Sequence, residues 1–234
     1  MSQQTIITTR LHGKCSKQLK LQFPNESNLE IRSMIAAIEK MFTQTDLLHR
    51  YYEPWRHYHR DEHIIACLQD LFAVHMSLSP TNRIRVFLAL TIHDSVYDPQ
   101  NANNEERSAE YGYYLLSAHH VLRTVADDVS SLVLSSKDHI LPQREELHTA
   151  AKIFLDCDLA ILGASSKIYQ EYAKNIRREY HWYSSSDYAQ GRAEIMQDFL
   201  DREKIYLTKY FCAKYEVRAR NNIAREISQL QNVI

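Results

Sequence analysis

Glycine is scarce in this chain, with only 4 among 234 residues. Glycine supplies many tight turns and lets backbone amides approach a phosphate group closely, so its scarcity leaves little material for hairpins or phosphate-binding loops. Neither GxGxxG nor GxxxxGKS/T occurs in the sequence. These absences disfavour a nucleotide-binding α/β fold.

Long apolar runs are also missing. No run reaches the length of about 18 residues that a membrane-spanning helix needs, and the first 17 residues lack the apolar stretch of a signal peptide. The four cysteines show neither paired metal-ligand spacing nor the density of a secreted disulfide scaffold. We therefore expect a reduced, cytoplasmic protein that has no membrane partner.

Neither positive nor negative charge is in excess in this chain. The chain has 28 Lys and Arg residues against 29 Asp and Glu residues, so nothing attracts it generally to nucleic acid. Residues 167–183 mix basic and aromatic side chains, but Ile168, Tyr172 and Ile176 at four-residue spacing favour an amphipathic core helix. We therefore expect no nucleic-acid partner.

What the chain does contain is helical periodicity. Apolar residues recur at intervals of three and four from Leu29 to Phe42, just after the capping-type residues 24–28. Further helices are expected at residues 61–78, 82–96, 104–122, 125–135, 144–162, 165–180, 187–210 and 213–231. The prediction is an all-α fold with a single-domain helical bundle over residues 26–234, preceded by a polar leader over residues 1–25.

Three histidines lie close together in residues 56–65, next to a predicted helix. If that helix begins slightly before residue 61, His59 and His63 stand four residues apart and share a face, whereas His57 lies on another side. Two imidazoles on one face can reach one site, but surface helices also carry such pairs. The pair indicates a site only if further ligands lie elsewhere.

Two later segments offer such ligands. His93 and Asp94 follow an apolar predicted helix, and an imidazole with a carboxylate suits Zn, Fe, Mn or a similar divalent metal. Asp156 and Asp158 lie within a strongly apolar segment, where an unpaired carboxylate is unfavourable and needs a cation or hydrogen bonds. Residues two apart differ by about 200° on a helix, so we expect only one of these two to face a given site.

A His, a His-Asp pair and a later Asp, each on its own helix, resemble the HD superfamily of metal-dependent phosphohydrolases. The motifs occur in order, and they are similar to the signatures of a bacterial branch of that superfamily. They are YYEPWRHYHRDEHI, IHDSVYDP, NEERSA, FLDCDLAILG, IRREY, GR and FLDREKIY, within roughly residues 46–226. The resemblance implies an HD-type bundle.

The resemblance also implies a ligand set for one divalent ion, which is Mn, Fe, Co, Ni, Zn or Mg. The implied ligands are His63, His93, Asp94 and Asp158, with Asp156 and His139 in reserve. A divalent ion held in this way lowers the pKa of water toward neutrality and offsets charge that develops on phosphorus. The expected nucleophile is therefore a metal-activated water.

Catalytic roles follow from a second similarity. The segment YHRDEHI is similar to the HNxxH element of cyclic-nucleotide phosphodiesterases, in which the first His protonates the leaving oxygen, and this implies that His59 is the general acid. Arg60 stands where that family has Asn, which weighs against a cyclic-nucleotide substrate. Glu105 and Glu106 either orient the attacking water or accept its proton, or they only complement the dipole of a helix N-terminus.

Several cations are candidates to contact the phosphate group. The main candidates are Arg56, Arg60 and Lys137, and the weaker ones are Arg177, Arg178 and Arg192. The implied function is hydrolysis of a phosphate ester or anhydride, for example a nucleotide. The alternatives are a non-catalytic regulatory module that binds metal and nucleotide, and an all-α interaction protein. The C-terminal helix covers either the core or a partner subunit of a homo-oligomer.

Overall fold

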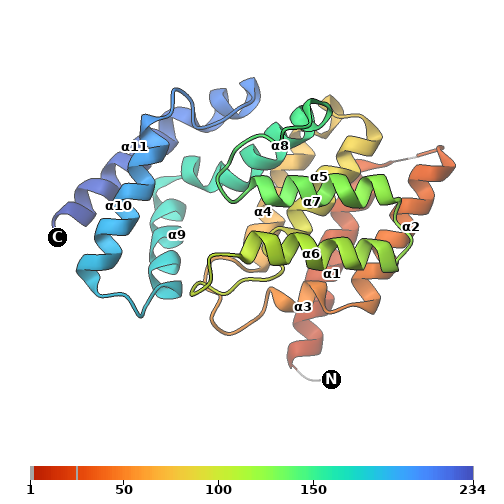
Figure 1. Ribbon diagram of the computed structural model, residues 1–234, viewed down its shortest axis with the longest axis horizontal. Helices are drawn as coiled ribbons and strands as arrows, with labels where there is room; N and C mark the ends of the chain where they lie inside the picture. Colours follow the sequence, from red (N-terminus) through yellow and green to blue (C-terminus); the bar gives the residue numbers. More distant parts are fainter. Residues whose placement is uncertain (1–2, 25, 234) are drawn as a thin grey trace. The chain divides into compact units, whose positions relative to one another are not determined.

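The computed structural model describes residues 3–24 and 26–233, and within them it contains helices and no strands (Figure 1). This confirms the predicted all-α fold class. The contact pattern divides the chain into two compact units, Met1–Cys157 and Asp158–Ile234. The sequence pattern marked no boundary at that point, which lies inside a helix.

The first unit contains most of the helices. They are α1 (Gln3–Gln22), α2 (Leu29–Gln44), α3 (Leu47–Arg50), α4 (Asp61–Val74), α5 (Pro80–Ile92), α6 (Asn104–Ala118), α7 (Arg123–Ser135) and most of α8 (His148–Leu159). The short 3-10 helices η1 (His75–Ser77) and η2 (Glu145–Leu147) also belong to it. The second unit contains η3 (Ala160–Gly163), α9 (Ser166–Glu179), α10 (Ser185–Asp201) and α11 (Lys209–Gln231).

Helix α5 forms the core of the first unit and contacts α4, α6 and α7. Ser79 caps its N-terminus by accepting a hydrogen bond from the Asn82 amide, and Pro80 occupies the first turn, where no amide hydrogen is needed. From Val86 to Ile92 every residue of α5 is buried. Each large apolar side chain buried in this way stabilises the fold by about 1.5–3 kcal/mol. The C-terminal end of α5 is therefore held firmly in place.

The segment expected as a polar leader is largely helical. Residues 3–22 form α1, and Leu11, Cys15 and Leu19 are fully buried on one face of it. Helix α1 contacts α4, α3 and α2, so it packs into the first unit rather than preceding it. The buried residues stand four apart in an otherwise polar segment, which explains why composition alone suggested a leader. Residues 1, 2 and 25 of that segment lie outside the described residues.

The helix expected at residues 187–210 is shorter in the structure. Helix α10 ends at Asp201, and the next residue has an extended backbone with ψ of 140°. Ile205 and Tyr206 are then buried, and their amides donate hydrogen bonds to the Glu216 carboxylate at 3.1 and 3.2 Å. Their apolar side chains fit the helical period, so the pattern did not reveal this break. Among the described residues, no helix has the length and apolar character needed to span a bilayer.

Candidate metal centre

Two helix ends in the first unit bring the candidate ligands together. His63 lies in the first turn of α4, and His93 follows α5 directly, continuing its hydrogen bonding by donating from its amide to the Ala89 carbonyl at 2.9 Å. Helices α4 and α5 are in contact. Both imidazoles are buried, with 5% and 2% of the residue surface exposed. Asp94 is adjacent in sequence to His93, so the packing of α5 positions both residues.

The metal-ligating atoms of these three residues converge. Nε2 of His63 lies 3.2 Å from Nε2 of His93, and Oδ2 of Asp94 lies 3.0 Å from Nε2 of His93 and 3.5 Å from Nε2 of His63. Two imidazole nitrogens and a carboxylate oxygen thus face one point. This donor set suits a divalent transition metal.

Contacts on the far side of each ring orient these nitrogens. Nδ1 of His93 lies 3.1 Å from the Leu90 carbonyl, which can only accept a hydrogen bond, so Nδ1 donates there and Nε2 faces the other two residues of the cluster. Nδ1 of His63 lies 2.9 Å from the Tyr58 hydroxyl, and the Cys67 thiol lies 3.6 Å from the same nitrogen. Metal-binding histidines commonly have outer partners of this kind.

The surroundings of the Asp94 carboxylate indicate whether these three residues fit a cation. Its Oδ2 atom is buried and receives no well-aligned hydrogen bond. Burial by itself raises the pKa of Asp94, but the charges of His93, His59 and His63 outweigh burial and hold that pKa below its ordinary value. A buried carboxylate oxygen without a well-aligned hydrogen bond from the described residues, facing two imidazole nitrogens, calls for a cation, so the three residues fit a divalent metal.

Arg56 was expected to contact phosphate, but its guanidinium is fully engaged within the protein. Nη1 donates to the carbonyls of Asp94 and His59 at 2.7 and 3.0 Å, and Nη2 lies 3.3 Å from the Ser95 carbonyl. Nε donates to the Glu53 carboxylate at 2.9 Å, and the side chain is fully buried. These contacts support a positioning role, because they fix the backbone on both sides of the centre.

His59 reaches the centre from a loop. Helix α4 begins at Asp61, and Arg60 has an extended backbone with φ of −130° and ψ of −170°, so His59 and His63 do not share a helical face as expected. The rings nevertheless lie close together, with centroids 6.1 Å apart, and the His59 ring also packs on Tyr97 with centroids 4.2 Å apart. His57 lies in the same loop and is half-buried.

The two candidate glutamates at the start of α6 have different surroundings. Glu106 is exposed and pairs with Lys137, and this hydrogen bond lowers the pKa of Glu106. Glu105 is half-buried, and burial raises its pKa, with a further contribution from the negative charge of Asp94. Glu105 therefore interacts electrostatically with the centre, whereas Glu106 and Lys137 neutralise each other. Arg60 is partly exposed, with its Nε 3.3 Å from the Glu62 carboxylate.

The remaining candidates are not part of this cluster. Asp156 is fully buried on α8, and His139 is half-buried in the segment after α7 with a left-handed backbone of φ 54°. Within the described residues, neither has a ligating atom that converges with the three residues. Asp158 is the first residue of the second unit and stays a predicted ligand. In that unit Arg192 pairs with Glu226, Arg177 donates to backbone carbonyls, and Arg178 bonds Asn175.

Sequence reasoning missed the residues that orient the cluster. Cys67 stands four residues after His63 on α4, and this spacing was a usable signal. Tyr58 and Tyr97 showed no such signal in the sequence, because both lie outside helices and their positions depend on loop conformation.

Together the residues form a largely buried, oriented donor set with an ionised carboxylate, flanked by a third histidine ring and a glutamate. Such a set can bind a divalent cation and place proton-transfer groups near it. No protein-family model matches the chain, and a search of curated proteins finds no similar sequence.

Proposed function

We propose that the chain is a metal-dependent phosphohydrolase of the HD type, which cleaves a phosphate ester or anhydride such as a nucleotide. The observation that carries this proposal is the convergence of Nε2 of His63, Nε2 of His93 and Oδ2 of Asp94 within 3.5 Å of one another. An incidental pair of surface histidines would not have buried rings whose Nε2 atoms face each other.

A divalent ion at these atoms would act as a Lewis acid toward a phosphoryl oxygen and lower the pKa of water. The chain's own residues supply the rest. The Leu90 carbonyl and the Tyr58 hydroxyl hold the two imidazole rings, and Arg56 holds the carbonyl of Asp94. The ligand geometry therefore does not depend on flexible surface side chains.

Glu105 and His59 have the proton-transfer roles in this proposal. The raised pKa of Glu105 brings that carboxyl closer to neutral pH, which suits a group that accepts a proton from water. His59 lies next to His63 and is half-buried, so it can deliver a proton to the leaving oxygen. Arg60 is partly exposed beside His59 and contacts the phosphate group, while Lys137 would first have to leave Glu106.

The test is a substrate screen on protein purified without added metal. We expect hydrolysis of a phosphomonoester, a cyclic nucleotide or a nucleoside triphosphate with at least one of Mn, Co, Ni, Fe, Mg and Zn. His63→Gln should abolish activity, whereas His75→Gln, which changes a partly exposed histidine outside the cluster, should retain it. Activity unchanged in His63→Gln would contradict the proposed site. Bound metal without turnover of any substrate would favour the regulatory module.

A further inference from the structure

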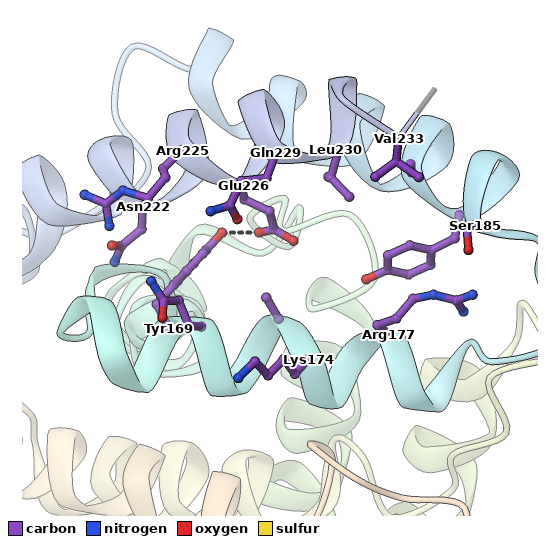
Figure 2. A pocket seen from close by; sticks show the side chains of 14 residues that line it. Tyr169, Lys174, Arg177, Ser185, Asn222, Arg225, Glu226, Gln229, Leu230 and Val233 are labelled. Atoms are coloured by element: carbon purple, nitrogen blue, oxygen red, sulfur yellow. Dashed lines mark hydrogen bonds between the residues drawn. The ribbon is translucent and has the colours of Figure 1, made fainter.

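The second unit contains a cavity of about 460 Å³ between α9, α10 and α11 (Figure 2). Sites for small organic molecules typically enclose about 300–1,000 Å³. All lining residues lie between Tyr169 and Val233, so the cavity belongs to the second unit alone and shares no residue with the metal centre. A ligand here would not depend on the proposed phosphohydrolase activity.

Among the described residues, one carboxylate, that of Glu226, lines this cavity, and it is already neutralised. Nε of Arg192, which lies outside the lining, is 3.0 Å from Oε1 of Glu226, and the Tyr169 hydroxyl donates to the same carboxylate. Nη2 of Arg192 also donates to the Tyr172 hydroxyl at 3.0 Å. Figure 2 shows Glu226 pointing from α11 toward α9 and Tyr169 meeting it from α9. The Glu226 side chain is therefore held in place in the wall of the cavity, and it does not attract a cationic ligand.

The other charged residues of the lining are all positive, namely Lys174, Arg177 and Arg225. Arg177 donates to the carbonyls of Tyr180 and Tyr183, and Arg225 donates to the Ser166 hydroxyl at 2.7 Å. These partners are uncharged, so the full positive charges remain. A cleft lined by one sign of charge attracts ligands of the opposite sign.

Apolar side chains and one unpartnered hydroxyl complete the lining. Apolar surface is provided by Ala173 on α9, Ala189 on α10, Leu230 on α11 and Val233 just after α11. The Tyr188 hydroxyl is buried and has no hydrogen-bond partner among the described residues, although a buried hydroxyl normally has one. Burial raises the pKa of Tyr188 to about 12, so the hydroxyl stays protonated near neutral pH and can donate.

We propose that this cavity binds a small organic anion, whose apolar body lies between the three helices and whose anionic group lies in the positive field of Lys174, Arg177 and Arg225, which are spread along α9 and α11. The Tyr188 hydroxyl donates a hydrogen bond to the bound molecule. An inorganic anion would leave the apolar walls uncovered, and an organic cation would meet three like charges. The anionic group is a carboxylate or a phosphate.

The binding test uses four eight-carbon probes and inorganic phosphate, with calorimetric titration of the full chain. Octanoate and octyl phosphate should bind with one site per chain, and whichever binds more tightly identifies the head group. Neutral octanamide should bind about fivefold or more weakly, and octylamine and inorganic phosphate more weakly still. Octylamine binding as tightly as octanoate, or no binding of either anion at about 1 mM, would overturn the proposal.

Variants locate the binding in this cavity. Lys174→Gln combined with Arg225→Gln should weaken octanoate binding about tenfold, because each exposed cation contributes a factor of up to about five. Arg178→Gln changes an exposed cation of α9 outside the lining and should leave the affinity unchanged. Tyr188→Phe should weaken binding about threefold or more. Thermal unfolding of each variant checks the fold, and equal affinity in the double variant and the control would refute the site.

Discussion

The two units each contain a buried group of charged residues, and the two groups differ in how their charges are satisfied. In the second unit, the Glu226 carboxylate is paired with Arg192 and accepts a hydrogen bond from Tyr169. In the first unit, Oδ2 of Asp94 faces two imidazole nitrogens and receives no well-aligned hydrogen bond. A mutually satisfied cluster serves the fold, whereas an unsatisfied one indicates a missing ligand.

The largest expected effect comes from breaking the satisfied cluster. Glu226→Gln keeps the shape of the side chain but leaves the Arg192 charge buried and unpaired, so we expect the free energy of unfolding to fall by about 3–5 kcal/mol. Denaturant unfolding measures this change. Glu171→Gln, at an exposed position of α9, is the matched control and should change it by less than about 0.5 kcal/mol. A loss as small in Glu226→Gln as in the control would show that the pair is not structural.

The metal cluster should respond to metal as well as to the variant. Without metal, Asp94→Asn should lower the free energy of unfolding, because the charges of His93, His59 and His63 that hold the pKa of Asp94 down lose their partner. A divalent ion at about 100 times its Kd should stabilise the wild type by about 2.7 kcal/mol and leave Asp94→Asn unaffected. Thermal unfolding with and without each metal tests this, and equal stabilisation of both proteins would contradict the assignment.

A smaller effect is expected from the residue that orients one ligand. Tyr58→Phe removes the hydroxyl 2.9 Å from Nδ1 of His63 and retains the ring. Outer partners of metal-binding histidines typically contribute about 10- to 100-fold in affinity, so metal should bind more weakly by about that factor. Competition with a chelating dye measures the Kd. Tyr114→Phe, on the exposed side of α6, is the control, and equal Kd values in the two variants would exclude a role for Tyr58.

The smallest effect concerns a buried group with no charge partner of its own. Burial raises the pKa of Cys15 from 9.0 to about 12. The pKa of Cys15 is higher in the folded than in the unfolded state, so the contribution of the neutral thiol to the free energy of unfolding is fully present below about pH 9. This contribution decreases as the pH rises toward 12, and about 1 kcal/mol of it is lost at pH 10. Denaturant unfolding at pH 8 and pH 10 should show this loss in the wild type and less of it in Cys15→Ala. An equal pH dependence in both proteins would contradict it.

Some features of the two units could be predicted from the sequence, and others could not. Helical periodicity predicts long elements such as α2, whose buried residues Ile31, Met34 and Ile38 follow the expected spacing. His63, His93 and Asp94 were identified because the ligands of a site must have particular chemistry. The partners of these ligands were not identified from the sequence, because the contacts of Arg56 and Tyr58 depend on the conformation of loop residues 51–60. Periodicity also could not show that α10 ends at Asp201.

The same limit applies to the candidate arginines. Arg56 had the same status in the sequence as Arg60, and Arg192 was a weaker candidate of the same kind, since an arginine suits phosphate wherever it stands. Only the fold distinguishes them, because Arg56 is enclosed by backbone carbonyls and Arg192 by Glu226, whereas Arg60 remains partly exposed.

The most direct test of the metal centre is the metal content of protein purified without added metal, measured by mass spectrometry for three proteins. We expect close to one divalent ion per chain in the wild type and in Asp127→Asn, which changes an exposed carboxylate of α7. We expect almost none in Asp94→Asn. Equal metal content in all three proteins, or a wild type that takes up no divalent ion even when it is supplied, would contradict the proposed metal centre.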